Sequence, residues 1–256
     1  MIQSVGLNAI THKAESLTER LRRVLAVHFH PQNGTPYWLD QARSLGIDPI
    51  RDIKTAADLA LLGNMTPSDL CERPMLDYVP RAFHTQMERF IVGQSGGTTG
   101  GGTWTVYRDD EFHEAFVRPF AIAAGRVGFP RGGQWLYVGP SGPHIIGKVV
   151  SQLARSMGSP DPFSVDFDPR WAKKLPHDSF ARTRYLGHIV KQAMAVIKTQ
   201  HIGVLFTTPA VIGALAQAMS TKDKQRIAGI HYGGMPLDVK TLAQYETNEF
   251  PNAVHL

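Results

Sequence analysis

The sequence predicts an α/β protein in which a mostly parallel β-sheet is flanked by helices, with a helical region before it. From about Phe90 onward, short runs of β-branched and aromatic residues alternate with helical runs, the pattern of a parallel sheet covered by helices. The preceding residues show helical spacing and no strand pattern. We therefore divide the chain into a helical N-terminal region, 1–85, and an α/β region, 86–256.

The N-terminal helices are predicted from apolar spacing and from capping residues. One amphipathic helix is predicted from about Lys13 to His28, because apolar residues recur on one face. Thr55 and Thr66 mark two later helix starts, since an aspartate follows each of them after three residues and can complete a capping box. A proline directly after Thr66 strengthens the second start.

The α/β region alternates strands and helices in order. The predicted strands cover 89–93, 104–107, 134–138, 163–167, 202–206 and 230–232. The predicted helices cover 145–156, a long segment with its apolar face at 186–197, and a segment that opens at Thr208-Pro209. Residues 252–256 look like the first half of another strand. A parallel α/β domain rarely stops there, so we expect this chain to be a truncated part of a longer protein.

Composition excludes several classes of protein. With 43% hydrophobic and 19% charged residues the chain is an ordinary globular protein, and its net charge of +5 comes from scattered Lys and Arg without a nucleic-acid module. We expect no nucleic-acid partner and, because no apolar run approaches the ~18 residues of a membrane helix, no membrane partner. The single cysteine, Cys71, fits a reducing compartment, so we expect a cytoplasmic protein. The sequence is also compatible with a homodimer.

A glycine-rich loop between two predicted strands is the most informative motif. Residues 94–103 contain five glycines, one serine and three threonines. Glycines permit close backbone approach, and hydroxyls can donate to anionic oxygens, so the loop suits the phosphates of a nucleotide triphosphate. No lysine or arginine lies between Gln94 and Tyr107, so the loop lacks a cation of its own. A flexible linker is the alternative interpretation.

Three segments together resemble the adenylate-forming acyl/aryl-CoA ligases, most closely their phenylacetate-CoA ligase-like branch. The glycine loop matches the family's Ser-Ser-Gly-Thr-Thr-Gly-Lys-Pro-Thr at six of nine positions, with Gly101-Gly102 replacing Lys-Pro. The turn at 139–147, Gly-Pro-Ser-Gly-Pro-His-Ile-Ile-Gly, is similar to the family's acyl-pocket segment. Residues 232–237, Tyr-Gly-Gly-Met-Pro-Leu, resemble its adenine-binding segment. The helical segments before the loop also resemble this branch.

The resemblance implies a role for each matching residue. It assigns phosphate binding to Ser95, Gly96, Gly97, Thr98, Thr99, Gly100 and Thr103. It assigns adenine binding to Gly233, Gly234, Met235 and Pro236. It assigns the acyl-substrate pocket to Tyr137, His144 and Gly147. No catalytic residue and no metal-ligating residue is assigned within the chain.

The implied chemistry has two half-reactions. A small-molecule carboxylic acid, aryl or arylacetic in this branch, reacts with ATP and Mg²⁺ to give an acyl-adenylate, and coenzyme A then takes the acyl group. The family's Tyr-Gly-x-Thr-Glu segment and C-terminal lysine do not occur in this sequence, so we expect residues 1–256 alone to be inactive. Two alternatives stay open: a non-catalytic nucleotide-binding or interaction remnant of the fold, and an acyl-protein synthetase-like activity.

Other polar clusters are given structural interpretations. His28 and His30 could share a metal, but no further ligand lies close in sequence, so a helix end is expected. The pairs Asp109-Asp110 and Asp166-x-Asp168 fall at element boundaries, where aspartates act as caps and turn formers.

Overall fold

The computed structural model describes residues 15–95, 102–234 and 236–256. The chain divides into two compact units, Met1–Glu88 and Arg89–Leu256. Among the described helices, none has the length and apolar character needed to cross a membrane. Each unit has its own hydrophobic core.

The first unit is helical, as predicted. Its elements are α1 (Leu17–His28), α2 (Pro36–Leu45), α3 (Pro49–Asp52), α4 (Pro67–Glu72) and 3₁₀ helices at Ala56–Leu62, Met75–Tyr78 and Arg81–Phe83. The predicted start of the first helix at Lys13 is wrong, because Ser16 and Glu19 form a capping box that begins the helix at Leu17. The expected capping boxes at Thr55 and Thr66 are present.

The second unit begins with an antiparallel hairpin and continues into alternating helices and strands. Its strands are β1 (Phe90–Gln94), β2 (Trp104–Arg108), β3 (Gln134–Gly139), β4 (Phe163–Asp166), β5 (Ile202–Thr207), β6 (Gly229–Tyr232) and β7 (Val254–His255). Its helices are α5 (Asp109–Phe112), α6 (Arg118–Val127), α7 (Ile145–Ser156), α8 (Pro169–Lys174), α9 (Phe180–Thr199), α10 (Pro209–Ala218), α11 (Thr221–Arg226) and α12 (Val239–Gln244). A strand, glycine loop and strand therefore occur in the predicted order, although residues 96–101 of the loop lie outside the described part.

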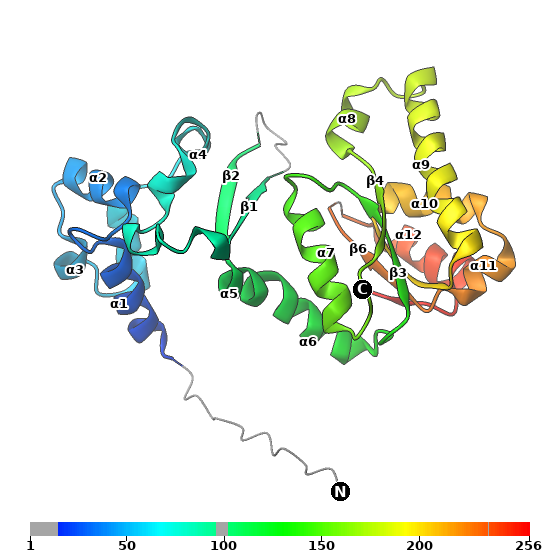
Figure 1. Cartoon of the computed structure of the whole chain (residues 1–256), viewed down its shortest axis with the longest axis horizontal. Helices are drawn as coiled ribbons and strands as arrows, with labels where there is room; N and C mark the ends of the chain where they lie inside the picture. Colours follow the sequence, from blue (N-terminus) through cyan, green and yellow to red (C-terminus); the bar gives the residue numbers. More distant parts are fainter. Residues whose placement is uncertain (1–14, 96–101, 235) are drawn as a thin grey trace, which may run out of the picture. The chain divides into compact units, whose positions relative to one another are not determined.

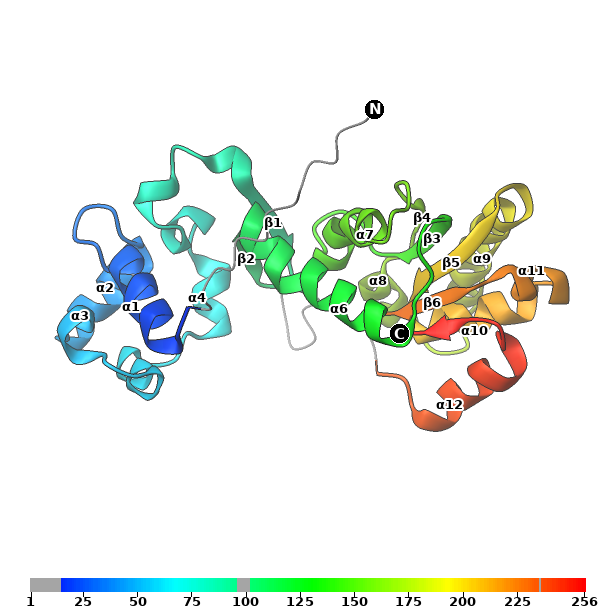
Figure 2. The same ribbon diagram turned by 90° about the horizontal axis from the view of Figure 1, so that it is seen from below.

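Five parallel strands form the sheet in the order β4-β3-β5-β6-β7. This confirms the predicted fold class. Figure 1 shows α7 on one side of the strands and α9 and α10 on the other, and Figure 2 shows β6 beside the short β7. The chain moves from β3 outward to β4 and then returns past β3 to β5, so right-handed crossovers place the connecting helices on opposite faces.

Alternation of side chains along the strands fills two cores. Trp135 and Tyr137 of β3 join a core with α5, α6 and α7, whereas Leu136 and Val138 join one with α9 and α10. The period of two is the reason that one strand serves both layers. Because β3 and β5 are neighbours whose connections leave in opposite directions, a crevice opens at their carboxyl ends.

Candidate nucleotide and acid site

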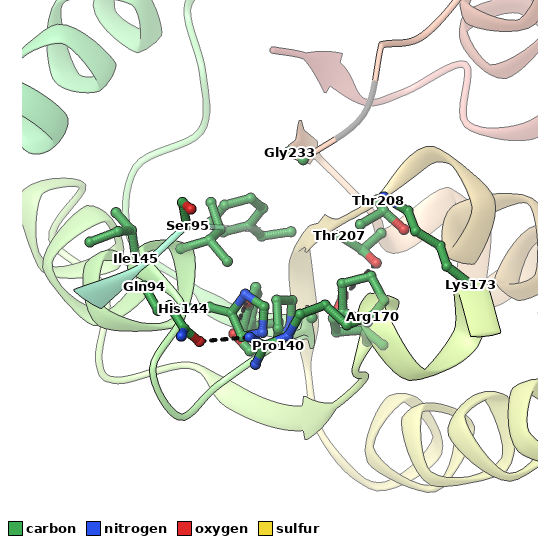
Figure 3. A pocket seen from close by; sticks show the side chains of 17 residues that line it. Gln94, Ser95, Pro140, His144, Ile145, Arg170, Lys173, Thr207, Thr208 and Gly233 are labelled. Atoms are coloured by element: carbon green, nitrogen blue, oxygen red, sulfur yellow. Dashed lines mark hydrogen bonds between the residues drawn. The ribbon is translucent and has the colours of Figure 1, made fainter. Parts of the chain in front are cut away.

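A cavity of about 290 Å³ lies at this crevice. Its walls come from the carboxyl ends of β3, β5 and β6, from the start of α7, from α8, and from the end of β1 (Figure 3). In open parallel sheets the point where strand order reverses is the usual ligand-binding crevice. The cavity therefore lies where the topology itself favours a binding site.

The end of β3 is folded back on itself to form one wall. The buried Tyr137 hydroxyl donates to the Pro140 carbonyl oxygen at 2.8 Å. Gly139 permits this, because a Cβ there would lie 2.5 Å from the Tyr137 hydroxyl oxygen. Burial raises the pKa of Tyr137, so the phenol stays neutral. It acts as a hydrogen-bond donor that holds the turn.

His144 precedes α7 and points its ring into the cavity region (Figure 3). Its side chain is 8% exposed, and its Nε2 atom has no hydrogen-bond partner among the described residues. Burial lowers the pKa of His144, and the nearby positive charge of Arg170 lowers it further. The imidazole is therefore neutral at pH 7, with a free nitrogen available to a ligand.

Two consecutive threonines end β5 and have different roles. Thr207 Oγ1 donates to the Val138 carbonyl oxygen at 2.7 Å and ties β5 to β3. Thr208, 7% exposed, has a buried Oγ1 atom that no described residue hydrogen bonds. An unpaired buried polar group costs about 1–3 kcal/mol. Thr208 and His144 line the same cavity, so one bound ligand can satisfy both.

The base of the glycine loop closes another side of the cavity. Ser95 and Thr103 pair across it, with their hydroxyl oxygens 2.9 Å apart and the Thr103 amide donating to Ser95 Oγ at 3.0 Å. The backbone amide nitrogen of Gln94 donates to the Pro143 carbonyl oxygen at 2.6 Å, next to His144. These bonds fix where the loop leaves and rejoins the cavity wall.

The charged side chains that line the cavity are positive, while Asp166 and Asp168 lie just outside its lining. Arg170 and Lys173 of α8 line it, and no aspartate or glutamate is among the lining residues. Arg170 Nη1 donates to Gln94 Oε1 at 2.7 Å. The remaining wall is mostly apolar, with Tyr137, Phe206 and Ile146 contributing large surfaces. Such a cavity suits an anion with an apolar body.

The structure brings only some of the predicted site residues together. Those that line the cavity are Ser95, Tyr137, His144, Gly233 and Gly234. Thr103 bonds to Ser95 behind it, while Gly147 and Pro236 do not line it. Gly96, Gly97, Thr98, Thr99, Gly100 and Met235 lie outside the described residues. The assigned roles of all these residues stay predictions.

Sequence reasoning missed the lining residues on α8 and at the end of β5. Thr208 carries a helix-start signal, and the polar pair that it forms with Thr207 at the end of a buried strand is the signal that points to a site. Arg170 carried no signal, because its helix is far from the other cavity segments in sequence. Asp168, beside it, is the expected cap, accepting from the Arg170 amide at 2.8 Å.

Within the described ranges, no group of three or more His, Cys, Asp or Glu side chains could hold a metal ion. Mg²⁺ usually binds through substrate phosphates and water with few protein carboxylates. An Mg²⁺ ion bound with ATP would therefore be held mainly by the nucleotide phosphates.

Gly147 supports the turn that carries His144, and we predict that a larger residue at this position destabilises the fold. A Cβ at this position would lie 2.6 Å from the Pro140 carbonyl oxygen and 2.8 Å from Ser141 Cα, both backbone atoms. Gly147→Ala should therefore lower the free energy of unfolding by about 1–3 kcal/mol. Chemical denaturation measures this change.

Gly187→Ala is the matched control. Gly187 lies within α9, and a Cβ there would meet no described atom within 4 Å. Alanine is the better helix former, so this variant should gain up to about 1 kcal/mol. Equal gains for both variants would show that the contact of Gly147 with the turn is unimportant.

Comparison with known proteins identifies structural neighbours. No model of a known protein family and no curated protein sequence matches the chain. A 2-hydroxyisobutyryl-CoA ligase in complex with 2-HIB-AMP and CoA matches with a TM-score of 0.59 and 17% identity, over 93% of this chain and 47% of that one. The same ligase in its postadenylation state with R3-HIB-AMP gives 0.60 and 15%, over 93% and 46%.

An open conformation of that ligase with 2-HIB-AMP and CoA also matches, with a TM-score of 0.55, 15% identity, and coverage of 93% and 48%. The chain thus spans about half the length of these structures. At 15–17% identity the likeness shows the fold alone, which the chain shares with this ligase. The narrower resemblance to the phenylacetate-CoA ligase-like branch stays a prediction.

Proposed function

We propose that the protein activates a carboxylic acid with ATP as an acyl-adenylate and then transfers the acyl group to coenzyme A, and that Arg89–Leu256 provides the nucleotide and acid site. One observation carries the proposal. Two buried polar atoms, His144 Nε2 and Thr208 Oγ1, have no described partner and line one positively charged cavity at the reversal of strand order. The shared fold with a CoA ligase supports the assignment.

The acid is proposed to be aryl or arylacetic. Tyr137, Phe206, Val138 and two isoleucines line the cavity, so a planar apolar ring can replace water against them. The volume of about 290 Å³ suits a small acid. The carboxylate then lies toward the polar rim formed by Ser95, His144 and the α8 cations.

In the first half-reaction, a carboxylate oxygen forms a bond to the α-phosphorus of ATP while the bond to pyrophosphate breaks. In the second, the CoA sulfur forms a bond to the acyl carbon, and AMP leaves. Both steps need the reactants held in line and their charge neutralised. Neutral His144 and Thr208 can orient the reacting groups by hydrogen bonds, while the charge must be met by cations.

Isothermal titration of the chain with ATP, phenylacetate and coenzyme A tests the proposal. We expect ATP and the acid to bind. Lack of binding by both would contradict the proposal. Nucleotide binding without binding of the acid would favour the non-catalytic alternative, and binding of ATP and acid without coenzyme A would favour an acyl-protein synthetase.

Substitution of the two neighbouring threonines separates ligand binding from folding. Thr208→Val removes a hydroxyl that has no described partner, so the free energy of unfolding should stay equal or rise, while ligand affinity falls about tenfold. Thr207→Val, its matched control, loses the bond to Val138 and should be destabilised by about 1 kcal/mol. Thermal melts with and without ATP and phenylacetate measure both effects, and unchanged affinity in Thr208→Val would remove Thr208 from the site.

A further inference from the structure

We propose that Arg170 is the cation that binds the anionic oxygens of the ligand in this cavity, with Gln94 and Asp168 as its positioning residues. The inference deepens the proposed function and rests on it only for the identity of the ligand. Both a carboxylate and a phosphate present paired anionic oxygens, and a guanidinium binds either one through two parallel N–H groups.

The glycine loop cannot supply this charge. No lysine or arginine occurs between Gln94 and Tyr107. His144 cannot supply it either, because burial lowers the pKa of that imidazole and leaves it neutral. The cationic side chains that line the cavity are Arg170 and Lys173, and no carboxylate is among the lining residues. Asp168, outside the lining, offsets part of the Arg170 charge from 3.8 Å. Two cations against one nearby carboxylate leave net positive charge at the wall, which favours an anionic ligand.

Contacts on two sides fix the Arg170 side chain. Nη1 donates to Gln94 Oε1 at 2.7 Å, and Nε lies 3.8 Å from Asp168 Oδ1. The Gln94 amide in turn donates from Nε2 to the Gly102 carbonyl oxygen at 3.1 Å. A hydrogen-bonded chain thus links α8 to the point where the glycine loop returns. The guanidinium has five N–H donors, these contacts involve only Nη1 and Nε, and the side chain lines the cavity.

Lys173, one turn along α8, is exposed and has no ion pair among the described residues. A flexible exposed ammonium loses more entropy on binding than the partly buried, already bonded guanidinium. We therefore assign the larger part of anion binding to Arg170.

Isothermal titration with four probes tests the assignment: ATP, inorganic pyrophosphate, benzoate and uncharged adenosine. Arg170→Gln should weaken binding of at least one anion by about 10- to 100-fold and leave adenosine binding unchanged. Loss confined to ATP and pyrophosphate identifies phosphate as the bound group, and loss confined to benzoate identifies the carboxylate. Lys174→Gln, on the same helix but outside the cavity lining, should bind every probe as wild type does.

Two further variants separate a charge effect from a folding effect. Arg170→Lys keeps the charge without the planar fork and should bind anions with intermediate affinity. Gln94→Glu keeps the shape of the side chain but places a carboxylate 2.7 Å from the guanidinium, so it should weaken anion binding as well. Circular dichroism melts of both variants check that the fold persists.

The outcomes for this assignment and for the proposed function are distinct. Wild-type binding of ATP and acid, with equal binding by Arg170→Gln, overturns the assignment and leaves the proposed function standing. Arg170-dependent binding of pyrophosphate without ATP binding supports the assignment and contradicts the function. Absence of wild-type binding to every anion overturns both.

Discussion

Phe206→Ala should lower the free energy of unfolding by about 3–5 kcal/mol, the cost of deleting a fully buried aromatic ring. Phe206 is 1% exposed, and its ring lies 5.3 Å from that of Tyr137 and 4.4 Å from that of His231 between ring centroids. It packs at the carboxyl end of β5, directly beneath the candidate site. Urea or guanidinium denaturation at pH 7 measures the change.

The same substitution should also impair ligand binding, because Phe206 lines the cavity. Removing the ring enlarges the cavity and frees Tyr137 and Gly233 to move. Phe180→Ala is the control, since that side chain is 78% exposed and its removal should change stability by less than about 0.5 kcal/mol. A loss of less than 1 kcal/mol in Phe206→Ala would mean that the core at the end of β5 is not closely packed.

Stability should fall as the pH is lowered from about 6.5 to about 4, and His231 is the main reason. The imidazole packs against Phe120 and Phe206, with centroids 4.9 and 4.4 Å away. Burial lowers the pKa of His231 to about 4 from its ordinary 6.5, although Nδ1 contacts the Leu256 carbonyl oxygen at 3.1 Å. The unfolded state therefore binds a proton in this window that the folded state does not.

The sign follows from that difference in proton binding. The contribution of neutral His231 to the free energy of unfolding is fully present above pH 6.5. It decreases as the pH falls toward 4, by at most about 3 kcal/mol. Denaturation curves at several pH values measure it. Asparagine cannot titrate, so the free energy of unfolding of His231→Asn should depend less on pH. A smaller dependence of the same sign should remain, because burial also lowers the pKa of His144. Replacing exposed His177 by Asn should leave the wild-type slope, and an equally steep slope in His231→Asn would exclude His231 as its cause.

Several local features were predictable because they depend on neighbouring residues. The β-rich runs around Tyr137 and Phe206 became strands, and the capping hydroxyl at Thr66 began a helix where expected. The start of α1 differs from the prediction, because the Ser16 capping box begins the helix at Leu17 rather than near Lys13. Apolar spacing and capping residues are both local signals, and the capping residue determined where this helix begins.

The site was only partly predictable, because its residues come from distant segments. Glycines at strand ends pointed to Gly233 and Gly234, and the turn before α7 pointed to His144. Nothing local distinguishes Arg170 from the other arginines of the chain. Its contact with Gln94, 76 residues away, exists because α8 follows β4, which pairs with β3, while the turn after β3 bridges to Gln94 at His144.

The sequence by itself determined the strands and several of the helices, where the glycine loop lies, and that the loop carries no positive charge. These properties depend on residue type, on periods of 2 and 3.6, and on short-range capping. Only the tertiary structure decided the strand order, the crevice between β3 and β5, and the burial that neutralises His144 and isolates the Thr208 hydroxyl. Strand order and burial depend on contacts between segments distant in sequence, which no local pattern specifies.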